Sequence, residues 1–258
     1  MNLIDKYRPR AIREILGQPW LVHQLELYLE RPYPCAFLFA GGTGTGKTSA
    51  ALALAESLGV DVEQEEFGGL HQIASGEQTG ESVRSKISAM RVRPFMGSGW
   101  KVLIVNEADC MTANAAQVWL DALESLPPQT VIVFTTNSAG RLPARLRDRC
   151  EGFAFESGLL SLRPYLQDLA DRIWATEVGG ECPPVEAFGP LVDENGDASF
   201  RRLIQRMAPY VRSKQPPDMR VADVFPISNK SNQPDRGAAA RKAWATRRAN
   251  SQRKAVSI

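Results

Sequence analysis

The chain has 258 residues, of which 43% are hydrophobic and 23% charged, so its composition is that of a globular protein with one large domain or two smaller ones. No apolar run could span a bilayer and the start lacks the apolar core of a signal peptide, so we expect no membrane segment and a cytoplasmic or nucleoid-associated location. The cysteines are widely spaced without a CxxC pair, which argues against a zinc site or a disulfide framework and fits a reducing compartment. They are Cys35, Cys110, Cys150 and Cys182.

From residue 1 to about residue 156, short apolar runs alternate with helical stretches, which is typical of an α/β fold with a parallel sheet and helices on both faces. The predicted strands are Cys35–Ala40, Lys101–Asn106, Thr130–Thr135 and Gly152–Phe155, with a further candidate at Leu70–Ala74. The predicted helices between them are Lys47–Leu58, Glu81–Arg91 and Asn114–Leu126.

Residues 159–212 form a second predicted domain, which is small and helical, after a plausible hinge at residues 156–158. Its predicted helices are Leu160–Thr176, Pro184–Val192 and Asp197–Tyr210. Residues 213–258 read as a linker and a basic tail, in which residues 229–258 hold eight Lys and Arg but only one acidic residue, Asp235. The end of this tail is either a basic helix or disordered. Trp244 among its arginines is a candidate to stack on a base or to insert at an interface.

A glycine-rich segment follows the first predicted strand directly, opens the first long helix and matches G-x-x-x-x-G-K-[ST] in full. The glycines let backbone amides approach phosphate oxygens, and the positive end of the following helix points at them. Lys47 would supply charge near the β- and γ-phosphates, and the Thr48 hydroxyl would ligate Mg²⁺. The segment therefore predicts a site for ATP with Mg²⁺, built from Gly41, Gly42, Thr43, Gly44, Thr45, Gly46, Lys47, Thr48 and Ser49.

A second apolar strand ends in polar residues, as P-loop enzymes require for the metal and the attacking water. Glu107 lies one residue past the predicted strand, where it could orient or deprotonate water. Asn106 stands where an aspartate usually supports the metal, and it keeps an oxygen acceptor without the charge. We therefore expect nucleotide binding to survive and hydrolysis to be weaker.

Motifs in one order along about 210 residues resemble the AAA+ module of clamp-loader subunits, in particular replication factor C small subunits and their viral and bacterial relatives. They are Lys6–Pro9 with Gly17-Gln18, the P-loop, Glu81–Arg84, Val102–Asp109 with Met111-Thr112, Leu123–Pro127, Phe134–Asn137, Leu146–Cys150 and Gly196–Arg202. The departures are Asn106 and Asp148, which replace the family's Asp and Ser. The resemblance implies a P-loop AAA+ domain followed by a helical lid domain.

The resemblance also implies roles for single residues. Tyr7, Arg8 and Pro9 would lie over the adenine. Asn137 would be sensor 1, close to the γ-phosphate and the water. Arg149 would be an arginine finger that reaches ATP held by a neighbouring AAA+ subunit, and Arg201, with Arg202 as the second choice, would be sensor 2.

Clamp-loader modules surround DNA, and a cluster of basic residues is a candidate for a non-specific grip on its phosphates. The cluster consists of Arg84, Lys86, Arg91 and Arg93. Clamp-loader subunits usually continue into a third helical domain that builds a pentamer collar, whereas about 45 residues follow Arg212 here. The alternatives to a collar are weak oligomerisation through the AAA+ faces, assembly only on DNA, or use of a partner protein.

Three functions remain open from the sequence. The first is an ATPase that loads or remodels a replication factor, such as a sliding clamp, on DNA. The second is an ATP-gated module with weak hydrolysis that binds DNA or protein. The third is a different AAA+ role, in helicase loading or DNA remodelling.

Overall fold

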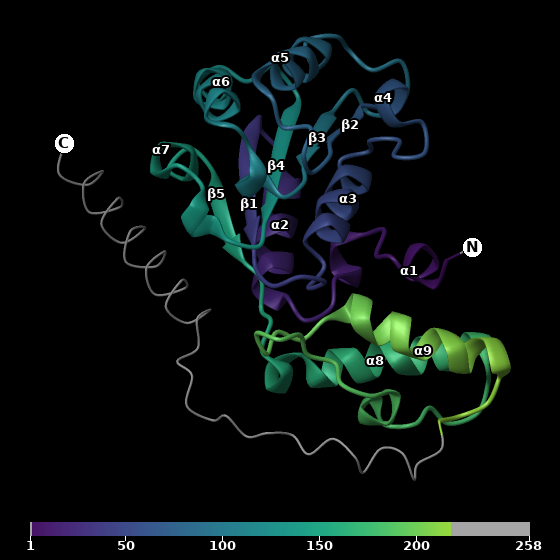
Figure 1. Ribbon diagram of the computed structural model, residues 1–258. Coiled ribbons are helices and arrows are strands. Elements are labelled where there is room, and N and C mark those ends of the chain that lie inside the picture. Colours follow the sequence, from purple (N-terminus) through teal and green to yellow (C-terminus); the bar gives the residue numbers. More distant parts are fainter. Residues whose placement is uncertain (1, 218–258) are drawn as a thin grey trace. The chain divides into compact units, whose positions relative to one another are not determined.

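The computed structural model describes residues 2–217 (Figure 1), and their contacts divide the chain into two units, Met1–Phe155 and Glu156–Ile258. The basic tail, including Trp244, lies outside the described residues. No described helix combines the length and apolarity that crossing a membrane requires.

A five-stranded parallel sheet in the order β2-β3-β4-β1-β5 forms the centre of the first unit. The strands are β1 Cys35–Ala40, β2 Leu70–Ile73, β3 Lys101–Val105, β4 Thr130–Thr136 and β5 Glu151–Ala154. Every strand boundary lies within one residue of its prediction, so the predicted α/β class is confirmed. Because the strands are parallel, their carboxyl ends meet at one edge of the sheet, and β1 lies between β4 and β5 there.

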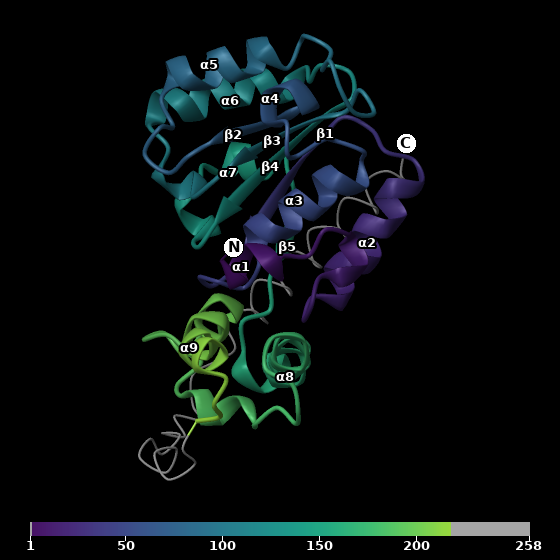
Figure 2. The ribbon, with the colours of Figure 1, turned by 90° about the vertical axis from the view of Figure 1, so that its right-hand side faces the viewer.

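Helices cover both faces of this sheet (Figure 2). The longer ones are α2 Pro19–Glu30, α3 Lys47–Ser57, α5 Gly80–Ala89 and α6 Ala113–Glu124. The short ones are α1 Leu3–Lys6, α4 Glu65–Gly68, α7 Ala144–Arg147 and the 3-10 turns η1 Ile12–Glu14, η2 Ala108–Cys110 and η3 Ala139–Arg141.

Alternate residues of each strand point to opposite faces of the sheet, and so the core has two parts. On one face, Phe37 and Phe39 of β1 pack with the buried alanines and leucines of α3 and with Leu25 of α2. On the other face, Leu38 of β1 packs with Trp119 of α6 and with residues of α5 and α7. The strands are therefore fixed from both sides, which holds the loops at their carboxyl ends in place.

The second unit contains α8 Leu159–Glu177, the 3-10 turn η4 Val185–Phe188 and α9 Phe200–Ser213. Trp174 of α8 meets Phe188 at a ring-centroid distance of 5.8 Å in its core. The predicted helix Pro184–Val192 is wrong: only a four-residue turn forms, because Gly189 adopts φ 99° and Pro190 follows it. The Ser199 side chain caps α9 by accepting a hydrogen bond from the Arg202 amide at 3.2 Å, so α9 begins later than its prediction at Asp197.

Candidate nucleotide site

The glycine-rich loop lies at the carboxyl edge of the sheet, between β1 and α3. Two of its glycines are required for different reasons. A Cβ on Gly41 would come within 2.8 Å of the Phe155 Cβ, whereas Gly46 has open space around it but adopts φ 102° as the N-cap of α3. The Thr45 hydroxyl donates to the Gly42 carbonyl at 2.8 Å and stabilises the turn between them. The backbone is thus shaped as phosphate binding requires.

Lys47 lies at the start of α3, and its side chain turns back over this loop. Its Nζ donates to the carbonyls of Gly41 and Gly42 at 2.8 and 2.7 Å and to Asn137 Oδ1 at 2.8 Å. Only 9% of Lys47 is exposed, so its charge is concentrated at the loop. The predicted P-loop lysine and the predicted sensor 1 residue, 90 positions apart in the chain, are therefore brought together.

The end of β3 lies beside the same loop. The Thr48 hydroxyl donates to Asn106 Oδ1 at 3.1 Å, so the two residues predicted to serve Mg²⁺ are in contact. Both offer oxygen atoms, the kind of ligand that Mg²⁺ takes, and both are uncharged. They therefore fit a metal that also binds the phosphates of a nucleotide, and they would hold it from the protein side.

Glu107 follows Asn106 in a left-handed backbone conformation, with φ 51°. Its amide donates to Thr135 Oγ1 at 3.3 Å and its side chain is exposed, which suits a residue that handles water. The buried side chain of Gln78 supports this conformation: its Nε2 donates to the carbonyls of Asn106 and of Glu107, the latter at 3.0 Å. Sequence reasoning missed Gln78, since a glutamine in a loop before a helix carries no signal of such a contact.

A second missed contact fixes the end of β4. The buried Thr136 hydroxyl donates to Asp109 Oδ1 at 2.5 Å and accepts from the Ser138 amide at 2.9 Å. Asn137 lies between these two anchored positions, and its exposed side chain reaches Lys47. Asp109 belongs to the acidic motif read from the sequence, and the structure gives it a supporting part.

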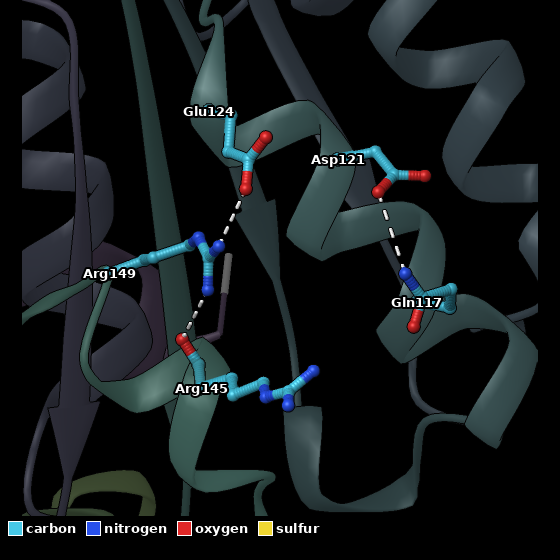
Figure 3. Close-up of polar contacts among 5 residues, drawn as sticks. All are labelled: Gln117, Asp121, Glu124, Arg145 and Arg149. Carbon is cyan, nitrogen blue, oxygen red and sulfur yellow. Dashed lines mark hydrogen bonds and ion pairs between the residues drawn. The ribbon is translucent and has the colours of Figure 1, made fainter.

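Arg149 lies between α7 and β5, and its contacts are with α6 and α7 (Figure 3). Its Nη2 donates to Glu124 Oε1 at 2.6 Å and its Nη1 donates to the Arg145 carbonyl at 3.2 Å. Its side chain is 33% exposed. The next residue, Cys150, is a buried free thiol, and burial raises its pKa to about 12.

The other predicted residues lie on or next to α1, α5 and α9. Arg8 pairs with Asp5 at 2.9 Å, and Tyr7 caps α1, so the adenine contact of Tyr7, Arg8 and Pro9 stays a prediction. Arg201 is exposed in the first turn of α9, in the second unit, and its role also stays a prediction. The predicted DNA-binding residues Arg84 and Lys86 lie on α5, with Arg91 and Arg93 exposed just after it.

Comparison with known proteins shows what the sequence and this geometry resemble. The profile of the AAA family, described as "ATPase family associated with various cellular activities", matches residues 37–156. The match covers most of the first unit. Its matched segment includes the P-loop and the end of β3, together with Asn137 and Arg149.

Several curated proteins named replication factor C small subunit resemble this chain. That of Archaeoglobus fulgidus is 32% identical over 154 residues, which are 59% of this chain and 48% of the relative. That of Thermoplasma volcanium is 34% identical over 146 residues, 56% of this chain and 45% of the relative. The predicted resemblance to clamp-loader AAA+ ATPases is thus confirmed, although the chain spans about half the length of these relatives.

Among solved structures, the Holliday junction branch migration motor RuvB of Thermotoga maritima has a TM-score of 0.60. The alignment covers 84% of this chain and 70% of RuvB at 17% identity. At that identity the likeness supports the AAA+ fold and nothing about the substrate.

Proposed function

We propose that this protein is a clamp-loader-like AAA+ ATPase that binds ATP with Mg²⁺ and hydrolyses it to load or remodel a replication factor on DNA. The observation that carries the proposal is the convergence of Lys47, Thr48, Asn106 and Asn137 at the carboxyl edge of the sheet. Nucleotides bind at this edge of parallel sheets, where helix N-termini and loop amides meet.

Each residue of the group has a task that its contacts support. The loop amides would hold the phosphates, and Lys47 would exchange its carbonyl partners for phosphate oxygens. Mg²⁺, held by Thr48 and Asn106, would offset charge that develops on the phosphates. Glu107 would orient or accept a proton from the attacking water, and Asn137 would position that water and the γ-phosphate.

The second part of the proposal is that ATP turnover needs a neighbouring AAA+ subunit. Arg149 lies outside the Lys47 group, it is partly exposed, and it belongs to a motif that resembles the family's arginine finger. An arginine supplied in this way can stabilise the transition state and accelerate hydrolysis by about 10³–10⁵-fold. Arg201 of the second unit would be the corresponding sensor on the nucleotide's own subunit.

DNA is the proposed polyanionic partner. Arg84, Arg91 and Arg93 are exposed and Lys86 is half-buried, and all four lie on α5 or within four residues of its end. A grip of this kind contacts phosphates without reading bases, so its affinity falls steeply as salt rises.

A group of large exposed apolar side chains next to this basic region suits a protein partner. Phe95 is 92% exposed, and Phe67 and Val92 are 72% and 68% exposed. The amides of Phe95 and Met96 both donate to the Phe67 carbonyl at 3.1 Å, which holds the loop after α5 against α4. We propose this apolar group as the contact with the replication factor, such as a sliding clamp, that the ATPase acts on.

The test is ATP turnover with and without primed DNA and a candidate clamp, read together with the mass of the assembly. We expect DNA to stimulate turnover and Lys47→Ala and Arg149→Ala to abolish it. The control is Arg172→Ala, which removes a more exposed surface arginine that also pairs with a carboxylate, that of Asp168 at 2.6 Å in the second unit. Unaltered turnover in Lys47→Ala or Arg149→Ala would refute the proposal, and capture of a helicase in place of a clamp would redirect it to helicase loading or DNA remodelling.

A second function is favoured by the contact between Thr48 and Asn106. With no carboxylate in this contact, the protein would hold Mg²⁺ less strongly, which suits an ATP-gated binding module with slow hydrolysis. This alternative predicts tight ATP binding, turnover near background, and a gain of turnover in Asn106→Asp. Brisk hydrolysis by the unaltered chain would rule it out.

A further inference from the structure

The guanidinium of Arg149 is held by two different elements. Glu124, the last residue of α6, binds Nη2 through Oε1 at 2.6 Å, and the carbonyl of Arg145 in α7 binds Nη1 at 3.2 Å (Figure 3). Both elements are anchored in the core, because Leu123 and Leu126 beside Glu124 and Leu146 beside Arg145 pack into the same apolar cluster. The direction of the Arg149 side chain is therefore set from both sides by elements of the folded unit.

These two contacts leave donors on the guanidinium. An arginine has five N–H groups, and the contacts with Glu124 and Arg145 use one on each terminal nitrogen. The remaining N–H groups can bind an approaching phosphate while both contacts persist, and the side chain is 33% exposed. The contact with Glu124 thus orients Arg149 without using up the donors that a phosphate needs.

We propose that Glu124 is a positioning residue for the arginine finger: its carboxylate holds Arg149 in the direction from which it contacts ATP on a neighbouring subunit. This inference rests on the proposed function, in which Arg149 acts across a subunit interface. Preorganised donors stabilise charge in a transition state more effectively than mobile ones, because no reorientation is needed during the reaction. A largely exposed ion pair contributes little to stability, so its loss should affect turnover more than folding.

The same helix provides a matched control. Asp121 lies one turn before Glu124 on α6 and is also a carboxylate, but it accepts from the Gln117 amide at 3.5 Å instead of contacting Arg149 (Figure 3). Asp121→Ala therefore removes the same charge from the same helix and leaves the arginine contact in place.

The experiment mixes two variants of the full chain. The donor chain carries Lys47→Ala and keeps Arg149, so it can supply a finger but cannot use its own site. The receiver chain carries Arg149→Ala and keeps its P-loop. Each should be inactive alone with ATP and primed DNA, and the mixture should recover turnover.

Adding Glu124→Ala to the donor should lower the turnover number of the mixture on the order of tenfold, with little change in the KM for ATP. Glu124→Gln in the donor should lower the turnover number less, because the amide oxygen of glutamine can still accept from Nη2 of Arg149. Glu124→Ala in the receiver and Asp121→Ala in the donor should leave turnover unchanged. These results would distinguish positioning of Arg149 from a general structural defect, because a structural defect caused by Glu124→Ala would lower turnover in whichever chain carries it.

Two results would overturn the inference while leaving the proposed function intact. If the parent variants complement but donor Glu124→Ala is as active as its parent, the ion pair is incidental. If donor Glu124→Ala is faster, Glu124 restrains the finger. Failure of the parent variants to complement would refute the action of Arg149 between subunits, and the inference would fall with it.

Discussion

Threonine and valine have similar shapes, yet Thr136→Val should lower the stability considerably. Thr136 is fully buried, and its hydroxyl makes hydrogen bonds to two partners. The change removes the donor to the Asp109 carboxylate at 2.5 Å and the acceptor for the Ser138 amide at 2.9 Å. Loss of a hydrogen bond to a charged group costs about 1.5–3 kcal/mol and loss of a neutral one about 1 kcal/mol. Since Asp109 is half-buried and can recruit water, we expect the free energy of unfolding to fall by about 2–3 kcal/mol.

The control lies on the same strand. Thr130 is also fully buried, but its hydroxyl donates to a single carbonyl, that of Pro128 at 3.2 Å, so Thr130→Val should cost about 1 kcal/mol. Urea denaturation followed by tryptophan fluorescence gives both values. Thr136→Val should in addition slow ATP turnover, because Asn137 follows directly, whereas Thr130→Val should not. Equal destabilisation by the two changes would refute the role assigned to the Asp109 contact.

Further predictions follow from single contacts. Gly46→Ala should abolish ATP binding measured by calorimetry, because φ 102° strains any residue with a Cβ, while Gly140→Ala, in open space, should bind normally. Gln78→Leu should reduce ATP turnover severalfold with a loss of stability of about 1–2 kcal/mol, since the carbonyls of residues 106 and 107 lose their donor. Burial raises the pKa of Cys150 to about 12, above its ordinary 9.0, so the unfolded chain ionises first and stability should fall as pH rises above 9. Cys150→Ala should reduce the steepness of that fall in denaturation curves at pH 8 to 10.

The sequence predicted the parts of the site whose chemistry is local. The glycines, Lys47 and Thr48 have their roles within eight adjacent residues, and the apolar run before them has the bounds of β1. Reliance on a local pattern also explains the error at residues 184–192. The apolar spacing there predicted a helix, but the 3-10 turn ends at Gly189. The spacing of apolar residues indicates which side chains are buried, and it does not exclude a turn of the backbone.

The supporting contacts could not be predicted because they join elements that only the sheet order brings together. Gln78 meets residues 28 and 29 positions later, and Thr136 meets Asp109, 27 positions earlier. Glu124 was recognisable as part of a motif, but its contact with Arg149, 25 positions on, needs α6 and α7 to pack side by side. A resemblance between motifs predicts which residues contact a nucleotide, and it does not identify the residues that support them.

The residues at the proposed metal position provide little negative charge. Thr48 and Asn106 are neutral, and the Asp109 carboxylate is engaged by Thr136. A hard divalent cation needs charged oxygens, and here the triphosphate must supply most of them. Mg²⁺ should therefore bind with ATP and only weakly alone, whereas Asn106→Asp should bind it in the absence of nucleotide. If calorimetry finds equal Mg²⁺ affinity for both proteins without ATP, residue 106 does not contact the metal, and the weak hydrolysis expected from its neutral side chain loses its physical basis.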